Sequence, residues 1–376
     1  MEKASPPRVW IMTAEYEPLI IGGLGTVATE LTKALNALHV NMNIVTASQT
    51  RRIQINHRNI TLLRIPKTSP YYKNKSYKSK HVRRLIARYL QHRPDLIHVH
   101  SLEFAKAALA LKRKYRIPVC YTCHSLASME SKKRSHGVKL QELLLRGADR
   151  IIVPSHWLKQ QIRRRYAKVS SKINVIPNGV TTISTGSKAP AYKLLFVGRI
   201  IRDKGIEALI GALPYLSRKN RRVQLTIVGK GSHKYQKRLK SIAKKRGVAS
   251  RIRWMGPLPH SKVQRLYSSY GAVVVPSKRE SFCLVALEAM ANRVPLVSSR
   301  AGGLREFVNK NNAQIIRNVN SRTIGRAIYK MWKHPKKIRR RVANAKLVAS
   351  RYHWRNIAIR YKRLFVSVSG RRGKNH

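Results

Sequence analysis

Two glutamates, Glu280 and Glu288, lie in the segment PSKRESFCLVALEAMANRVPLVSSRAGGLREFV and have the types and spacing needed for chemistry. The apolar run AVVVPS over 272–277 predicts a buried strand, and the spacing of Leu, Ala and Met predicts a helix over 282–292. Glu280 then lies in the loop after the strand, where open α/β sheets bind ligands. Glu288 lies two turns into the helix, so both carboxylates are expected to line one crevice.

Acidic residues are scarce in this chain, which makes these carboxylates more informative. The sequence has 79 Lys and Arg but only 14 Asp and Glu, where a chain of 376 residues usually carries on the order of 45 acids. Two interpretations of Glu280 stay open. It is either a ligand-binding carboxylate or half of a structural ion pair with Lys278 or Arg279.

Two cations are predicted at the mouth of the same crevice. Arg199 and Lys204 occur in FVGRIIRDKG, directly after a predicted strand. Fixed cations stabilise a departing phosphate without reorganisation, so a diphosphate is the natural ligand. The alternative is that either cation belongs to the general basic surface.

Two glycine-rich turns offer backbone N–H groups to an anion. Gly22 and Gly23 lie between a strand and a long helix, and Gly302-Gly303 precede a helix expected to start at Leu304. The N-terminus of a helix attracts anions. The first turn lacks the acid about 20 residues later that a dinucleotide-binding fingerprint requires, and a tight turn alone is the alternative. Carboxylates that suit sugar hydroxyls and donors that suit phosphates together predict a nucleotide sugar.

His124 follows the predicted strand PVCYTC and is expected to reach the crevice, with a buried, hydrogen-bonded histidine as the alternative. His98 and His100 alternate at another strand end, but no third ligand has zinc-site spacing. Cys120 and Cys123 lie on opposite faces of a predicted strand, which argues against a redox pair. No Asp-x-Asp pair occurs in the sequence, so we expect no carboxylate-held metal and no cofactor.

Short apolar strands alternate with amphipathic helices along almost the whole chain, which predicts parallel sheets covered on both faces. The small, polar segment TTISTGSKAP over 181–190 is typical of a linker. We therefore predict an α/β fold with two tandem Rossmann-like domains facing a cleft, over 1–185 and 186–350, and a hairpin at 52–65. Residues 351–376 are expected to form a C-terminal helix that packs back on the first domain, followed by a basic tail.

The formal net charge of +65 is extreme and predicts electrostatic association with an anionic membrane or with phosphate polymers. No specific nucleic-acid partner is expected, because no base-reading motif occurs. A merely solvated basic surface is the alternative. No apolar run approaches 18 residues and the first residues hold no apolar signal region, so we expect a cytoplasmic protein, with a peripheral position at the inner membrane face as an option.

In combination the motifs resemble glycosyltransferase family 4, the retaining nucleotide-sugar transferases of the GT-B fold. The resemblance covers essentially the whole chain, and the N-terminal stretch is most similar to the glycogen and starch synthase branch. It implies an acceptor-side domain over 1–185 and a nucleotide-sugar domain over 186–350. The motifs that carry it are EYEPLIIGGLGTVATEL, LIHVHS, YTCHS, VIPNGV, FVGRIIRDKG, PSKRESFCLVALEAMA and AGGLREFV.

The resemblance also implies roles for single residues. Arg199 and Lys204 would bind the leaving diphosphate, Glu280 the transferred sugar and Glu288 the ribose hydroxyls. His124 would lie by the reacting face of the sugar. The residues implied to approach or contact the donor through their backbone are Gly22, Gly23, Gly303 and Leu304.

The chain departs from the family pattern at four positions that bear on the sugar and acceptor. Cys283 follows Glu280 where the family usually has glycine, and it is expected to narrow or reshape the sugar pocket. The others are Ile20 in place of Lys, Thr26 in place of Asp, and Thr181 in place of Asp.

The leading interpretation is a metal-independent retaining hexosyltransferase that uses a UDP-, ADP- or GDP-sugar and a glycan or lipid acceptor. The alternative is a catalytically weak, polyanion-binding or spore or envelope structural protein on the same scaffold. The +65 charge and Cys283 motivate that alternative.

Overall fold

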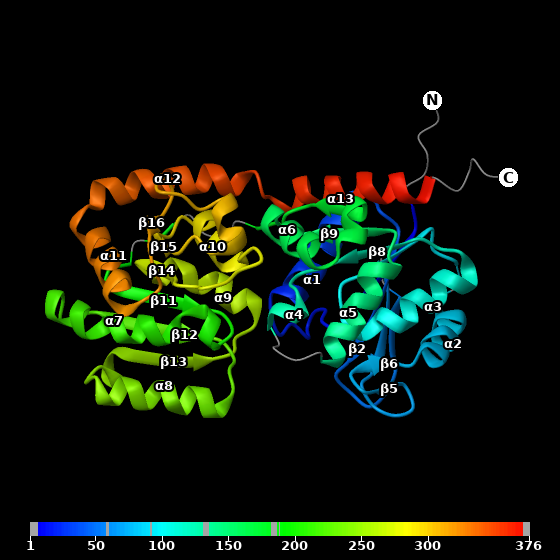
Figure 1. The fold of residues 1–376 in the computed structure, drawn as a ribbon, viewed down its shortest axis with the longest axis horizontal. Helices are drawn as coiled ribbons and strands as arrows, with labels where there is room; N and C mark the ends of the chain where they lie inside the picture. The colour runs from blue at the N-terminus through cyan, green and yellow to red at the C-terminus, as the bar shows by residue number, and fades with distance from the viewer. Residues whose placement is uncertain are drawn as a thin grey trace. The chain divides into compact units, whose positions relative to one another are not determined.

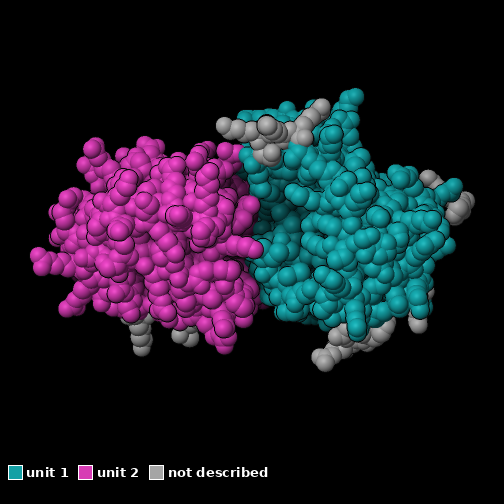
Figure 2. Space-filling view, turned by 90° about the horizontal axis from the view of Figure 1, so that it is seen from below, with its two compact units in different colours: residues 1–179, 354–376 teal, residues 180–353 magenta. Residues whose placement is uncertain are grey.

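The computed structural model describes residues 7–57, 60–90, 92–130, 135–181, 186–187 and 189–370. The chain divides into two compact units: unit 1 is residues 1–179 with 354–376, and unit 2 is residues 180–353 (Figure 2). The sequence-based domain boundaries were 185 and 350. Residues 182–185 and 188 of the predicted linker, and the tail over 371–376, lie outside the described residues.

Unit 1 contains an eight-stranded sheet flanked by helices (Figure 1), and its strand order is β10-β9-β8-β7-β1-β2-β4-β3. Its strands are β1 Val9–Thr13, β2 Met42–Ser48, β3 Gln54–His57, β4 Thr61–Pro66, β7 Leu96–Val99, β8 Val119–Thr122, β9 Arg150–Val153 and β10 Ile173–Val175. All neighbours are parallel except β3 and β4, which form the hairpin predicted at 52–65. A separate small hairpin joins β5 Tyr72–Lys73 to β6 Ser76–Tyr77.

The helices of unit 1 come between these strands, with one exception: the last helix of the chain also belongs to this unit. The α-helices are α1 Gly23–Asn36, α2 Ser79–Tyr89, α3 Ala105–Tyr115, α4 Ala127–Glu130, α5 His136–Gly147, α6 His156–Arg165 and α13 Trp354–Ser369. The 3₁₀ helices are η1 Leu102–Phe104 and η2 Ala167–Lys172.

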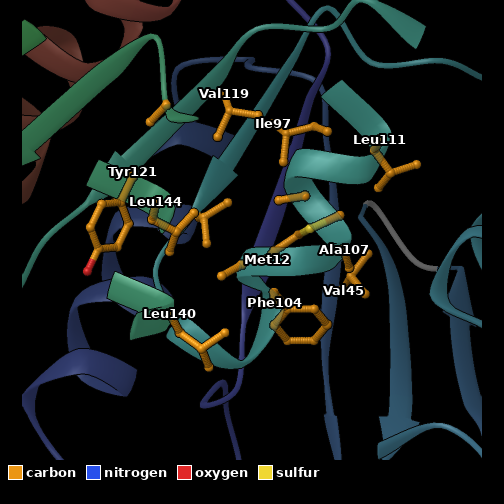
Figure 3. Packing of buried hydrophobic residues seen from close by; sticks show 14 of the residues in the cluster. Met12, Val45, Ile97, Phe104, Ala107, Leu111, Val119, Tyr121, Leu140 and Leu144 are labelled. Carbon is orange, nitrogen blue, oxygen red and sulfur yellow. The ribbon is translucent and has the colours of Figure 1, made fainter. Parts of the chain in front are cut away.

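The core of unit 1 follows from the alternation of side chains along its strands. Met12, Val45 and Ile97 point from β1, β2 and β7 toward α3 and α5, where residues such as Leu111 and Leu144 meet them (Figure 3). On the other side of the sheet α1 packs against α13, which also contacts β7. Helices therefore cover both faces, as near-continuous apolar strands require.

Unit 2 contains a six-stranded, all-parallel sheet with strand order β13-β12-β11-β14-β15-β16. The strands are β11 Lys193–Val197, β12 Gln224–Val228, β13 Ile252–Gly256, β14 Ala272–Val275, β15 Leu296–Ser298 and β16 Gln314–Ile315. The α-helices are α7 Ile206–Lys219, α8 His233–Lys245, α9 His260–Leu266, α10 Leu284–Ala291, α11 Ser321–Lys333 and α12 Pro335–Ser350. The 3₁₀ helices are η3 Arg202–Lys204, η4 Ala249–Arg251, η5 Tyr267–Ser269 and η6 Gly302–Glu306.

Two hydrophobic clusters cover the two faces of the unit 2 sheet. Leu194 and Phe196 of β11 join the cluster formed with α7, α8 and α11, whereas Leu195 between them joins the cluster formed with α10 and α12. This period of two is what a strand buried on both faces requires.

The prediction of two tandem Rossmann-like α/β domains is confirmed, while the cleft that they were expected to face stays a prediction. The predicted helix start at Leu304 is wrong. Only the five-residue 3₁₀ helix η6 forms there, and the chain then continues toward the short strand β16. The left-handed φ of +58° at Gly302 turns the backbone sharply, and the Leu304 N–H then closes a tight bond to the Ala301 carbonyl.

Candidate active site

The carboxyl ends of β11 and β14 lie at the switch point of the unit 2 sheet. The chain runs from β11 outward through β12 to β13, then returns to the other side of β11 with β14, β15 and β16. Parallel α/β sheets bind ligands outside the strand ends at such a point. Arg199 and Lys204 follow β11, and Glu280 follows β14.

Gly205 brings the loop of Lys204 close to the end of β14. This residue has a φ of +69°, and a Cβ added to it would come within 1.9 Å of the Pro276 carbonyl oxygen. Only glycine allows that approach, because every other residue carries a Cβ. The DKG sequence therefore positions Lys204 beside the loop of Glu280.

Glu280 and Lys204 form a buried ion pair. The Lys204 Nζ donates to Glu280 Oε1 at 2.6 Å, and the Ser277 hydroxyl donates to the same oxygen at 2.8 Å. The side chains are 8% and 20% exposed for Glu280 and Lys204. Burial alone lowers the pKa of Lys204, but the neighbouring groups, led by the Glu280 carboxylate, together raise it above its ordinary value, so Lys204 stays charged. The charge of the exposed Arg199 acts on Lys204 in the opposite sense.

The structure identifies the cation that pairs with Glu280. Its partner is Lys204, 76 positions earlier in the chain, and not Lys278 or Arg279. Arg279 instead lies with its Nε 3.6 Å from the Asp203 carboxylate, on the exposed side of the loop.

The two glycines of the AGGLREFV motif support the loop of Glu280. A Cβ on Gly302 would come within 2.0 Å of the Glu280 carbonyl oxygen, and the Gly303 N–H donates to that same oxygen at 2.9 Å. The Leu304 N–H donates to Ala301 at 3.2 Å. Both amides expected to contact a donor therefore already have backbone partners, and the bond of Gly303 supports the loop that holds Glu280.

Glu288 is held by two side chains that the sequence did not reveal. The Tyr267 hydroxyl donates to Glu288 Oε2 at 2.6 Å, and His260 Nε2 lies 2.9 Å from Oε1. Burial, together with the charge of Glu288, raises the pKa of Tyr267 well above its ordinary value, so the phenol remains a donor. A carboxylate has about four acceptor positions, so Glu288 keeps capacity for ligand hydroxyls.

Cys283 takes up a backbone conformation that favours glycine. It precedes α10 with a φ of +86°, a region that residues with a Cβ adopt at an energetic cost. Burial, followed by the nearby Glu280, raises the pKa of the Cys283 thiol well above its usual range. The thiol is therefore protonated and occupies space beside Glu280 rather than acting as a nucleophile.

In unit 1 the switch point of the sheet lies between β1 and β7, and three histidines gather beside it. We call His98, His100 and His124 the histidine cluster. His100 Nδ1 lies 3.1 Å from His124 Nε2, and His98 Nε2 lies 2.7 Å from the Thr122 hydroxyl. Burial lowers the pKa of His98 to about 3, of His124 to about 4, and of His100 well below its ordinary value. All three imidazoles are neutral at neutral pH.

The unpaired ring nitrogens indicate the tautomers. His98 Nδ1 and His100 Nε2 are buried without a hydrogen-bond partner. A buried N–H without an acceptor is costly, so these atoms are best left as bare nitrogens and the protons placed on the bonded ones. His100 then donates from Nδ1 to His124 Nε2, and His124 carries its own proton on Nδ1. This arrangement makes His124 a neutral donor.

The glycine turn after β1 is occupied by a side chain of the same unit. Glu15 Oε2 accepts from the N–H groups of Ile21 and Gly22 at 3.0 and 3.1 Å. Gly25 leaves room for this carboxylate, because a Cβ there would come within 2.8 Å of it. In the structure two amides of this turn bond to the carboxylate of Glu15, a residue that sequence reasoning did not single out, and the contact of Gly22 and Gly23 with a donor stays a prediction.

The structure thus brings Arg199, Lys204, Glu280 and Cys283 together in unit 2, next to loops that contain Gly303 and Leu304. We call Glu280 and Glu288, with their partners Lys204, Tyr267 and His260, the carboxylate cluster. His124, Gly22 and Gly23 lie in unit 1. Among the described residues, no group of three or more His, Cys, Asp or Glu is arranged to hold a metal ion. None of the described helices combines the length and apolar character needed to cross a bilayer.

Two family models match consecutive parts of the chain. The one described as Glycosyltransferase Family 4 matches residues 21–183, and the one described as Glycosyl transferases group 1 matches residues 183–348. The first therefore covers most of unit 1 and the second covers most of unit 2.

Curated relatives match over shorter stretches. Glycogen synthase of Mycobacterium tuberculosis is 34% identical over 229 residues, which is 57% of this chain and 54% of that protein. D-inositol 3-phosphate glycosyltransferase of Thermobifida fusca is 29% identical over 56% of this chain and 55% of that protein. The chain thus spans about half the length of these relatives. An uncharacterized glycosyltransferase of Methanocaldococcus jannaschii is 26% identical over 80% of this chain and 82% of that protein.

Solved structures match over nearly the full length. Sucrose-phosphate synthase from Thermosynechococcus elongatus has a TM-score of 0.81 at 20% identity, covering 97% of this chain and 100% of that one. Anabaena HepE, solved with UDP-glucose, has a TM-score of 0.76 at 18% identity and covers 96% and 100%. The catalytic domain of starch synthase IV from Arabidopsis thaliana, bound to ADP and acarbose, has a TM-score of 0.75 at 16% identity and covers 97% and 100%. At these identities the similarity establishes the fold.

Proposed function

The chain belongs to glycosyltransferase family 4 with the GT-B fold, and from this premise we propose that it transfers a hexosyl group from a nucleoside diphosphate sugar. The acceptor is a glycan, a lipid or another hydroxyl compound, and the anomeric configuration is retained. The observation that carries the proposal is the buried Glu280–Lys204 pair at the switch point of the unit 2 sheet.

The pair leaves Lys204 suited to a leaving diphosphate. An ammonium has three N–H donors, and Glu280 uses one of them, so the others remain for phosphate oxygens. The raised pKa of Lys204 keeps the charge in place before and after transfer. Arg199 adds a second cation from the same loop. Such preorganised charges stabilise the developing negative charge on the leaving group.

The remaining residues receive complementary roles. Glu280 binds a hydroxyl of the transferred sugar, and Glu288, held by Tyr267 and His260, binds the ribose hydroxyls. His124, as a neutral Nδ1–H donor, binds the sugar on its reacting side. In the proposal the turn containing Gly22 and Gly23 contacts the diphosphate only when Glu15 is displaced or shares the amides, and Gly303 and Leu304 act by holding Glu280.

The relatives favour an enzyme over the alternative of a structural, polyanion-binding protein, because the reported matches are synthases and glycosyltransferases. HepE was solved with UDP-glucose and starch synthase IV with ADP, which supports UDP- and ADP-sugars as the first donors to test, with GDP-sugars beside them. We also propose a cytoplasmic location with peripheral membrane association, supported by the net charge of +65.

Transfer is proposed to be metal-independent, since Arg199 and Lys204 supply the positive charge that a divalent ion would otherwise supply to the diphosphate. EDTA should leave turnover within about twofold. Loss of turnover on chelation and its recovery with Mg²⁺ or Mn²⁺ would show that a metal is needed.

The direct test is release of nucleoside diphosphate from a panel of UDP-, ADP- and GDP-hexoses, with and without glycan acceptors. The wild-type protein should release one of them faster than Glu280→Gln. Glu207→Gln is the matched control, because Glu207 forms an exposed surface pair with Arg238 at 3.2 Å and loses the same charge. Equal rates in wild type and Glu280→Gln would refute the proposed site.

A further inference from the structure

Unit 2 contains a hollow of about 570 Å³ at the β16 edge of its sheet. It is formed by the loop after β15, the segment around β16, and side chains from α11 and α12. It shares no lining residue with the carboxylate cluster. We call it the basic pocket, and five cations line it: Arg300, Lys310, Arg317, Lys330 and Arg341.

This concentration of charge exceeds what the composition explains. Lys and Arg make up 79 of 376 residues, so about two of the nine lining residues would be cationic by chance, whereas five are. The other four are Asn, Gln and Ile residues, with no acid among them. None of the five cations forms a salt bridge with an acid in the described part of the chain.

Arg341 gives the pocket a buried charge. This residue of α12 is 9% exposed, and its guanidinium is held by neutral partners alone. Its Nη1 donates to Gln314 Oε1 at 2.6 Å and its Nε donates to the Lys310 carbonyl at 3.0 Å. Burial lowers the pKa of Arg341, because burial disfavours the charged form. A charge buried without a countercharge is unfavourable, and an anion in the pocket would compensate it.

The exposed cations surround this buried one, and one of them is oriented. The Arg300 Nε donates to the Val308 carbonyl at 3.0 Å, which leaves the terminal nitrogens of its guanidinium for a ligand. Lys310, Arg317 and Lys330 are exposed at the rim. Guanidinium groups bind phosphate oxygens in bidentate fashion, and several cations around one hollow match several linked negative charges better than one.

We propose that the basic pocket is a second anion-binding site, separate from the donor site, that takes a chain of linked phosphates. The net charge of +65 raises the local concentration of such polyanions around the whole protein. The basic pocket then binds one stretch of the polyphosphate at a defined place on unit 2. The proposal does not rest on the transferase activity.

The test is calorimetric titration of the 376-residue protein with inorganic tripolyphosphate at fixed ionic strength. Arg317→Gln/Lys330→Gln removes two exposed cations of the pocket, so the fold should remain intact. Lys237→Gln/Lys244→Gln removes two exposed cations from α8, toward the β13 end of unit 2, and is the matched control. We expect binding to weaken at least tenfold in the pocket variant and less than threefold in the control. Equal losses in the two variants would show that the charge acts diffusely.

Two further arms separate this pocket from other phosphate sites. Arg199→Ala/Lys204→Ala removes the cations of the proposed donor site, and tripolyphosphate should still bind it at the basic pocket. Loss of all binding in that variant would overturn the proposal. Sedimentation with phosphatidylglycerol vesicles should be reduced equally in the pocket and α8 variants. A selective loss in the pocket variant, with unchanged tripolyphosphate binding, would assign the pocket to lipid headgroups instead.

Arg341→Met gives an independent readout. If the buried guanidinium is kept for an anion, this variant should bind tripolyphosphate more weakly while its melting temperature stays the same or rises. A variant that melts lower but binds normally would show that Arg341 serves the fold of unit 2 alone.

Discussion

The carboxylate cluster of unit 2 and the histidine cluster of unit 1 both lie near the switch points of their sheets. They differ in charge: the buried carboxylates have partners, whereas the buried imidazoles are neutral. In the carboxylate cluster each glutamate is buried with a partner: Glu280 with Lys204, and Glu288 with Tyr267 and His260. In unit 1 burial leaves the three imidazoles neutral. The same strand-end position therefore supports either charged or neutral chemistry.

The difference implies that the two clusters respond to different perturbations. A buried carboxylate is stabilised by its charged or hydrogen-bonding partner. Removing that partner leaves a buried charge without compensation, which is unfavourable. A neutral imidazole depends on pH, because protonation places a charge where solvent is absent. Substitutions should therefore affect unit 2 most strongly, and acid should affect unit 1.

The largest effect is expected from Glu280→Gln. Turnover should fall about 10³-fold, since the variant loses the contact with the sugar and the countercharge of Lys204. Binding of the nucleoside diphosphate should change by no more than a few fold, because Glu280 is assigned to the sugar. Steady-state kinetics and calorimetry measure the two quantities. Near-normal turnover of this variant would show that Glu280 is not needed for sugar transfer.

Lys204→Ala and Arg199→Ala should each slow turnover by about 10²–10³ and weaken binding of the nucleoside diphosphate. Lys204→Ala should also lower the melting temperature, because it leaves the 8%-exposed Glu280 without its cation. Arg199→Ala should leave the melting temperature unchanged, because Arg199 is exposed. Full activity of Arg199→Ala would assign Arg199 to the general basic surface, and full activity of Lys204→Ala would limit Lys204 to its structural pair with Glu280.

Acid should destabilise the protein through the histidine cluster. The pKa of His98 is lowered to about 3 in the folded state, against about 6.5 in the unfolded chain. Below pH 6.5 the unfolded chain therefore binds more protons at His98 than the folded protein does. The free energy of unfolding is unaffected by His98 above that pH and decreases as the pH falls. At pH 5 the loss is about 2 kcal/mol for this group.

His98→Leu should flatten the dependence of melting temperature on pH between 7 and 5. His233→Leu, on the exposed first turn of α8, is the control and should not change it. Identical pH profiles for wild type and His98→Leu would mean that His98 takes up no proton on unfolding in this range.

The smallest effect is expected from Cys283→Gly. Glycine adopts a φ of +86° without steric cost. The free energy of unfolding should therefore rise by about 1 kcal/mol, and the variant should melt roughly 2–4 °C higher. Cys283→Ala keeps the Cβ and removes the thiol, so it should show no gain. A gain in the alanine variant would assign the strain to the sulfur rather than to the backbone.

The strand pattern was enough to predict two sheets covered by helices, because apolar strands that alternate with amphipathic helices favour a parallel sheet buried on both faces. It also predicted that Glu280, Lys204 and His124 follow strands. It could not predict the Glu280–Lys204 bond, since that bond depends on β11 and β14 being neighbours and on the close approach at Gly205.

The contacts that sequence reasoning missed depend on the folded chain. Glu15, Tyr267 and His260 are ordinary residues in sequence, and only the folded chain brings them to a glycine turn or to Glu288. The amides of Gly303 and Leu304 were expected to contact the donor, but each already has a backbone partner: Leu304 bonds to Ala301 in a tight turn, and Gly303 bonds to the distant Glu280. A single tight turn leaves no periodic signal in the sequence, and a bond between distant residues depends on the folded chain.

Unit 1 is made from both ends of the chain, and this has a consequence for biosynthesis. Trp354, at the start of α13, lies over Gly179, where a Cβ would come within 2.3 Å of its ring, and Tyr361 and Phe365 of the same helix lie against His98. A ribosome delivers α13 only after it has translated all of unit 2, which takes roughly ten to thirty seconds at about 5–20 residues per second. During that interval one face of the first sheet lacks its last helix, so the nascent chain completes its second unit before its first.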